Sequence, residues 1–274
     1  MSSGDRIQST FSRLKKEGRA GLVTFITAGD PDPKTSQQLM AQLPDAGSDI
    51  IELGMPFSDP MADGPAIQAA NLRALASGAS LMGTLDMVRR FRENNSTTPV
   101  ILMGYFNPIY QYGPSRFVTD AVAAGVDGLI MVDLPPEEDE ELCDPARTAG
   151  LHWVRLVTPT SNESRLKQVL QNTSGFIYYV SIAGITGTRS AAASAIGEAL
   201  ATVRKHTQLP IAVGFGINTA DQVRETGEVA DGAVVGSAII REIENNLDAS
   251  GCAKPELLDR VTGLVSELAG GLRS

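Results

Sequence analysis

Residues 49–65 read DIIELGMPFSDPMADGP, and this stretch indicates a buried strand followed by a stiff loop. The apolar run at 50–53 is interrupted only by Glu52 and is followed by a glycine, as expected at the end of a buried strand. Three prolines and two glycines between 54 and 65 then keep the chain out of a regular element. A carboxylate on a buried strand is costly unless it is satisfied or used. Glu52 is therefore a candidate for chemistry, and Asp63 on the loop is a second carboxylate in a different setting.

Two carboxylates in unlike environments are typical of general acid–base catalysis. The structural alternative is that Glu52 pairs with a buried arginine and that Asp63 caps the helix expected to begin near Ala66. Perturbed carboxylates also occur in structural networks, so this stretch alone leaves both interpretations open.

The composition excludes several classes of protein. The chain has 274 residues and a net charge of −9, with acidic and basic residues interspersed. This balance argues against nucleic-acid binding and against a polybasic membrane face, and no apolar run approaches the length of a membrane span. Cys143 and Cys252 lie far apart and form no metal or disulfide framework. Residues 1–16 read as an amphipathic helix without the apolar core of a signal peptide, so we expect a soluble cytoplasmic protein.

Strand-like runs alternate with helical patterns along the whole chain. Strands are expected within 21–31 and at 49–53, 99–103, 128–132, 152–157, 176–180, 210–213 and 232–235. This alternation implies parallel strands with right-handed crossovers. Eight units in this length predict one domain over 1–274, a (β/α)8 TIM barrel with an extra N-terminal helix. A doubly wound open sheet is the alternative. We also expect a loop at 104–108 and a single acidic helix over 137–149.

Residues that follow the strands of a barrel gather at one face, where active sites form. The turns after the last two predicted strands carry Gly214, Gly216, Gly236 and Ser237. Glycine amides and a helix N-terminus at this place commonly bind phosphate, and Thr186 and Gly187 could close over the same anion. The alternative is that these glycines only form tight turns.

The remaining residues exclude several kinds of catalytic chemistry. All six lysines fall in helical or terminal stretches, so no strand lysine is available for a Schiff base. Neither His152 nor His206 is a good metal ligand candidate, and no glycine-rich dinucleotide fingerprint follows the first strand. A cofactor-free, metal-free reaction run by carboxylates remains. Aromatic residues near strand ends together suit a flat ring ligand, although core packing is the favoured explanation for any one of them: Phe25, Tyr105, Tyr178 and Phe215.

Residues 52–68, ELGMPFSDPMADGPAIQ, resemble the signature of the tryptophan synthase alpha chain family. Shorter matches follow in order along nearly the whole chain: TAGDP at 27–31, MGYFNP at 103–108, DLP at 133–135, GITG at 184–187 and GFGI at 214–217. The resemblance implies cleavage of indole-3-glycerol phosphate to indole and glyceraldehyde 3-phosphate. It makes Glu52 the general acid and base, and it makes Asp63 the acceptor of the indole N–H.

The same resemblance implies an indole pocket and a phosphate site. Around the indole it places Phe25, Ile67, Met103, Tyr105, Tyr178 and Phe215, with Tyr178 also hydrogen-bonding Glu52. Around the phosphate it places amides of Gly187, Gly216, Gly236 and Ser237, and Thr186 would close over the loop that holds Asp63. Met103 stands where leucine is common and Thr188 where alanine is common, which affects only pocket shape and lid behaviour.

The resemblance also implies a partner, a beta chain that carries pyridoxal phosphate, in an α2β2 heterotetramer. The loops at 59–60 and 107–108 would face it, and no cofactor is expected in this chain. Two other functions remain open, namely a non-catalytic phosphate-ligand-binding regulatory subunit and a stand-alone indole-releasing lyase. The pair of carboxylates argues against the first, because pure binding does not need both.

Overall fold

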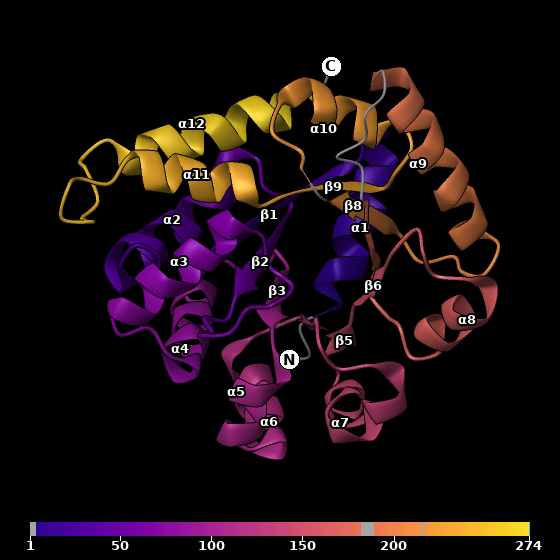
Figure 1. The fold of residues 1–274 in the computed structure, drawn as a ribbon, viewed down its shortest axis with the longest axis horizontal. Helices are drawn as coiled ribbons and strands as arrows, with labels where there is room; N and C mark the ends of the chain where they lie inside the picture. Colours follow the sequence, from indigo (N-terminus) through magenta and orange to yellow (C-terminus); the bar gives the residue numbers. More distant parts are fainter. Residues whose placement is uncertain (1–3, 182–188, 215, 274) are drawn as a thin grey trace.

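The chain forms a parallel barrel surrounded by helices (Figure 1). The computed structural model describes residues 4–181, 189–214 and 216–273. Every pairing between neighbouring strands is parallel, in the order β5-β4-β3-β2-β1-β9-β8-β7-β6. The strands are β1 Gly21–Thr27, β2 Ile50–Gly54, β3 Val100–Gly104, β4 Gly128–Met131, β5 His152–Trp153, β6 Arg155–Val157, β7 Ile177–Val180, β8 Ile211–Gly214 and β9 Gly232–Val235.

The two ends of this strand order are one continuous segment. β5 pairs with β4, β6 pairs with β7, and only Val154 separates them. The amide of Val154 donates to the carbonyl of Leu129 at 2.9 Å, so the segment still belongs to the sheet. β5 and β6 are therefore one barrel strand that turns from one neighbour to the other and closes the ring. The predicted (β/α)8 barrel is confirmed, and the open sheet is excluded.

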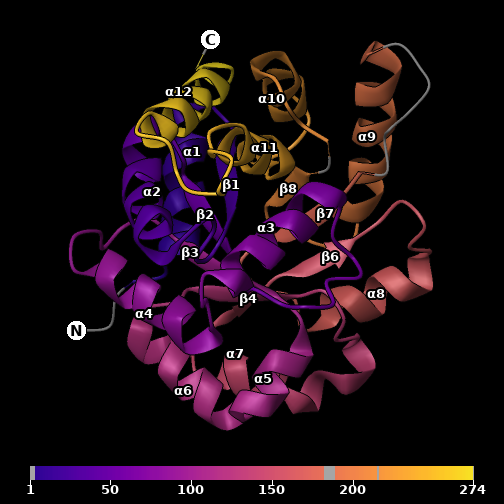
Figure 2. The same cartoon turned by 60° about the vertical axis from the view of Figure 1, so that its left-hand side comes forward.

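Helices cover the outside of the ring (Figure 2). Local capping explains several of their ends: Asp5 accepts the amide of Gln8 before the first helix, and Thr219 forms a capping box with Gln222. The helices are α1 Arg6–Glu17, α2 Pro33–Ala46, α3 Pro65–Ala76, α4 Leu81–Arg92, α5 Phe106–Tyr112, α6 Pro114–Ala124, η1 Pro136–Glu141, α7 Cys143–Thr148, α8 Glu163–Gln171, α9 Arg189–Arg204, α10 Ala220–Gly227, α11 Ser237–Asn245 and α12 Leu257–Gly270. In the described part of the chain, no helix is both long enough and apolar enough to cross a membrane.

Two local predictions are wrong. The expected loop at 104–108 gives way to α5 at Phe106, because Pro108 lies in the first helical turn, where a missing N–H costs nothing. The expected single helix over 137–149 is split at Leu142, whose φ of −147° is not helical. The first piece is held instead by Asp139, which pairs with buried Arg155 and accepts the side-chain amide of Asn172 at 2.9 Å.

The interior of the barrel is closed from below by the N-terminal helix. Ile7, Phe11 and Leu14 of α1 pack against apolar residues that point inward from the strands, among them Ile50 and Ile101. A larger core fills the space between the sheet and the outer helices. The floor under the inner residues of β2 is therefore apolar.

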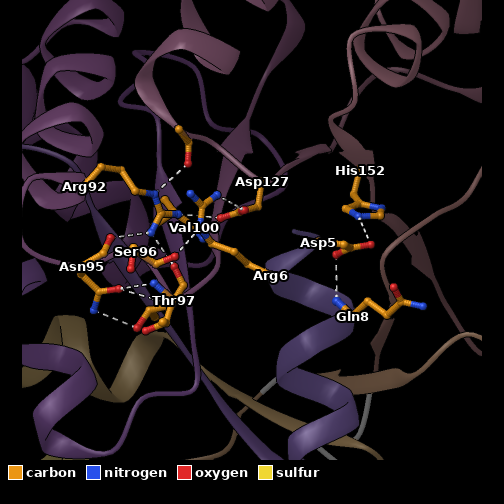
Figure 3. A network of polar contacts seen from close by, with 12 residues as sticks. Asp5, Arg6, Gln8, Arg92, Asn95, Ser96, Thr97, Val100, Asp127 and His152 are labelled. Carbon is orange, nitrogen blue, oxygen red and sulfur yellow. Dashed lines mark hydrogen bonds and ion pairs between the residues drawn. The ribbon is translucent and has the colours of Figure 1, made fainter. Parts of the chain in front are cut away.

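Charged contacts fasten α1 at this lower end (Figure 3). Asp127, just before β4, accepts from Arg6 at 2.8 Å and from Arg92 at 2.6 Å. On the other side of α1, Asp5 lies 2.9 Å from Nε2 of His152. This network lies at the end of the barrel away from the carboxyl ends of the strands.

Candidate active site

Glu52 is a buried carboxyl group in the barrel wall. It lies in the middle of β2, in register with Phe25 on β1 and Ile101 on β3, and it is 1% exposed. Among the described residues, neither of its carboxyl oxygens has a hydrogen-bond partner. In the described part of the chain, neither the arginine partner considered above nor the expected hydrogen bond from Tyr178 is therefore present. Burial raises the pKa of Glu52 from its ordinary 4.5 to about 8, so the group holds a proton at neutral pH.

Asp63 lies on the loop between β2 and α3 and differs from Glu52 in its protonation at neutral pH. Burial raises its pKa to about 6, and a hydrogen bond with Tyr105 opposes that rise. Asp63 therefore remains mainly ionised at neutral pH. It does not cap α3, because the capping position belongs to Gly64 and no side chain caps this helix. The loop is fixed by backbone bonds, including the amide of Asp63 to the carbonyl of Pro60 at 3.0 Å.

Tyr105 fastens the loop from the side of β3. Its hydroxyl accepts the amide N–H of Ala62 at 2.9 Å, one residue before Asp63. Its ring lies 5.3 Å from that of Phe57, measured between centroids. Burial and the nearby charge of Asp63 raise the pKa of Tyr105, so the phenol stays protonated and able to donate.

A small cavity brings four of the predicted residues together. Phe25, Asp63, Met103 and Tyr105 line it, along with Gly54, Met55, Asn71, Gly104 and Val132. Space here depends on glycine: a Cβ at Gly54 would stand 2.7 Å from Cζ of Phe25. Larger hollows lie around α1, but neither Glu52 nor Asp63 lines them.

Tyr178 and Ile67 lie at the edges of this group. Tyr178 is half-buried on β7, and its hydroxyl lies against the backbone of Gly214. Burial raises the pKa of Tyr178 well above its ordinary range, and the carboxyl groups of Glu52 and Asp63 raise it further. Ile67 on α3 is half-buried and packs against the outer core.

The expected phosphate end is formed by the start of α11. Gly236 precedes this helix, and a Cβ there would stand 3.3 Å from Cβ of Phe25. The first intrahelical bond runs from the amide of Ile240 to the carbonyl of Gly236, and no side chain caps the helix. The first-turn amides, including that of Ser237, are thus suited to an anion. Gly216 has a φ of 76° and is exposed.

Three predicted site residues lie outside the described residues: Thr186, Gly187 and Phe215.

Comparison with known proteins identifies the family. Residues 11–265 match the family model described as "Tryptophan synthase alpha chain". The chain is also similar to the solved structure of tryptophan synthase subunit alpha from Legionella pneumophila str. Paris. The identity is 40% and the TM-score 0.89, over 97% of this chain and 98% of that one. This chain belongs to the tryptophan synthase alpha chain family.

Other solved structures are similar to this chain over nearly its whole length. A structure of tryptophan synthase from Mycobacterium tuberculosis, in an open form with BRD0059 bound, has 31% identity and a TM-score of 0.86, covering 98% of this chain and 99% of that one. The resemblance drawn from residues 52–68 is confirmed, as is the function of a tryptophan synthase alpha subunit, a lyase of tryptophan biosynthesis. In this family the alpha chain works without a cofactor, and pyridoxal phosphate belongs to the beta chain.

Asn71 is a structural part of this alpha-chain site that the sequence analysis missed. It is 4% exposed, and its Oδ1 accepts the amide of Phe57 at 2.9 Å. Its Nδ2 donates to the carbonyl of Ile67, also at 2.9 Å. Asn71 therefore ties the start of the loop to α3. The spacing in the sequence could have indicated this role, because Asn71 lies four residues after Ile67 and therefore on the same helix face.

Glu52 should make the stability of this alpha chain fall with pH. Its folded-state pKa exceeds its unfolded value, so its stabilising contribution is complete below about pH 4.5 and is lost as pH rises through about 8. Glu52→Gln removes this dependence. Between pH 5.5 and 7.5, the free energy of unfolding of the wild type should fall relative to the variant by about 1.4 kcal/mol per pH unit, or roughly 3 kcal/mol.

Urea unfolding of both proteins across this range measures the difference. Asp63 titrates in both proteins, so its contribution cancels. Parallel pH curves for the two proteins would mean that Glu52 is not a buried proton-holding group.

Proposed function

We propose that this chain, as one barrel domain over 1–274, cleaves indole-3-glycerol phosphate with Glu52 as general acid and base and Asp63 as the partner of the indole N–H. The observation that carries the proposal is the opposite protonation of the two carboxyl groups. Glu52 is buried, unpartnered within the described residues and protonated at neutral pH, whereas Asp63 is ionised beside a cavity lined by aromatic and apolar side chains.

The reaction needs two proton transfers, and Glu52 takes part in both. Protonated Glu52 gives its proton to carbon three of the indole, which leaves positive charge on the ring. Asp63 accepts the ring N–H and stabilises that charge. The bond from carbon three to the glycerol chain then breaks as the adjacent glycerol hydroxyl becomes an aldehyde and gives its proton to the Glu52 carboxylate. Glu52 ends protonated again, so one turnover restores the enzyme.

The two ends of the substrate have separate places in this proposal. The indole lies among Phe25, Ile67, Met103, Tyr105, Tyr178 and Phe215. The phosphate rests on amides of Gly187, Gly216, Gly236 and Ser237, and Thr186 closes over Asp63. The closeness of Phe25 to Gly236 supports this arrangement: a Cβ built at Gly236 would stand 3.3 Å from Cβ of Phe25, so the ring end lies near the start of α11.

The proposed partner is a tryptophan synthase beta chain, in an α2β2 assembly in the cytoplasm. Two neighbouring strand ends present surfaces suited to contact. After β2, Asp59 is exposed and Met61 is 85% exposed. After β3, α5 presents Asn107 and Tyr110, and Tyr110 is 60% exposed. The proposed beta chain would cover these exposed side chains.

Indole release from indole-3-glycerol phosphate, with and without a beta chain, tests the proposal. We expect slow release by the chain alone and a large increase with the partner. Full activity without the partner would indicate a stand-alone lyase. A folded chain that binds the substrate but releases no indole in either case would instead be a regulatory subunit.

A further inference from the structure

Arg73 links three elements that each carry part of the proposed site. It lies on α3, whose first residue follows the Asp63–Gly64 step. Its Nε donates to Oδ1 of Asp30 at 2.7 Å and its Nη2 to Oδ2 at 3.0 Å, so the pair is bidentate. Asp30 belongs to the turn after β1, and its side chain is fully buried.

The third contact of Arg73 reaches α11. Its Nη1 lies 3.6 Å from Oε1 of Glu244, in the last turn of that helix. The two helices pack against each other and against β1 (Figures 1 and 2). A second bond joins α3 to the same turn, from the hydroxyl of Ser77 to the carbonyl of Gly29 at 3.0 Å.

Among the described residues, no other side chain joins α3, the turn after β1 and α11 in this way. β1 carries Phe25, α3 continues directly from Asp63, and α11 begins at Gly236 and Ser237. A helix moves as a stiff unit, so a shift of α3 at Arg73 is carried to Asp63 at its start. The contact of Arg73 with Glu244 likewise holds α11, and the phosphate end lies at the start of that helix.

We propose that Arg73 is a positioning residue that sets the spacing between Asp63 and the phosphate-binding end of the site. The inference rests on the function proposed above. Arg73 does not touch the reacting atoms, and its effect is on how well one substrate can reach both ends at once. A misplacement of about 1 Å can reduce a rate by about 100-fold.

The chemistry of the contact favours arginine specifically. A planar guanidinium matches both oxygens of a carboxylate, whereas a lysine ammonium makes a single point contact. Asp30 needs such a partner, because burial raises its pKa and Arg73 opposes that rise. Lysine at this position keeps the charge near Asp30 but cannot also reach Glu244 through a second nitrogen.

Arg73→Lys separates positioning from simple binding. We expect kcat/KM for indole-3-glycerol phosphate to fall about 10- to 100-fold. The dissociation constants of indole alone and of glyceraldehyde 3-phosphate alone should stay within about 2-fold, because each end of the site is intact. An unchanged kcat/KM, or a fall matched by equal loss of affinity for both fragments, would overturn the proposal. Glu244→Gln should cost only about 3-fold, since its contact is longer and half exposed.

Arg92→Lys is the matched control, because it alters a buried arginine–aspartate pair at the opposite end of the barrel (Figure 3). It should lower the unfolding temperature and leave kcat/KM within about 2-fold. An equal kinetic loss in this control would show a general effect of destabilisation and overturn the proposal.

If Arg73→Lys does not fold, the double variant Asp30→Asn with Arg73→Gln decides, because it removes both charges together. Full activity in that variant would contradict the positioning role. A wild type that cleaves no substrate would contradict the proposed function itself, which keeps the two failures distinct.

Discussion

Glu52→Gln is expected to reduce indole release by about 1,000-fold or more. The glutamine has nearly the same shape but can neither give a proton to the ring nor accept one from the glycerol hydroxyl. A single positioned acid or base contributes about 100- to 10,000-fold, and Glu52 serves in both steps. No described side chain hydrogen-bonds this carboxyl group, so none is in place to transfer the proton instead. The measurement is single-turnover indole formation with the beta chain present.

The variant must be shown to be folded and to bind. Unfolding in urea and binding of glyceraldehyde 3-phosphate test this, and stability should be at least that of the wild type, since the buried carboxyl group of Glu52 is no longer there to ionise. Glu267→Gln, at an exposed position on α12, is the matched control and should keep full activity. Turnover by Glu52→Gln within tenfold of the wild type would remove Glu52 from the mechanism.

The barrel was predictable because its strands are buried on both sides. Such strands read as continuous apolar runs bounded by glycine or proline, and β8 and β9 are clear cases. The chain was less informative where a tertiary contact determines the local structure. The break at Leu142 depends on Asp139 of η1 meeting Arg155, which lies on β6. The short helix α5 depends on a proline in its first turn, which reads equally well as part of a loop.

The site was predictable in its residue types but not in its contacts. Glu52 could be placed on a buried strand, yet whether an arginine would meet it was open. Arg155 is buried in the barrel wall, but its guanidinium binds Asp139 and the carbonyl of Leu134 and not Glu52. Arg73 gave no signal of its own, because Asp30 and Glu244 are distant in sequence and meet it only in the folded barrel.

Asp63→Asn is expected to reduce kcat/KM by about 100- to 1,000-fold, because it removes the negative charge that stabilises the protonated ring. The variant should also change the pH profile. In the wild type, Asp63 must be ionised, so kcat/KM rises with pH through about 6. Glu52 must hold its proton, so kcat/KM falls as pH rises through about 8. The free enzyme should therefore give a bell-shaped profile between these values.

Loss of the acidic limb in Asp63→Asn distinguishes this charge from other groups that titrate near the site. The residual activity of the variant should be level from pH 5 to 7 and should still fall through about 8, since Glu52 is unchanged. Tyr105→Phe provides a matched test on the same group. It removes the hydrogen bond that lowers the pKa of Asp63, so the acidic limb should move to higher pH while the alkaline limb stays in place. An acidic limb that persists in Asp63→Asn would assign that titration to another residue, and an unshifted limb in Tyr105→Phe would mean that the phenol does not hold this carboxylate.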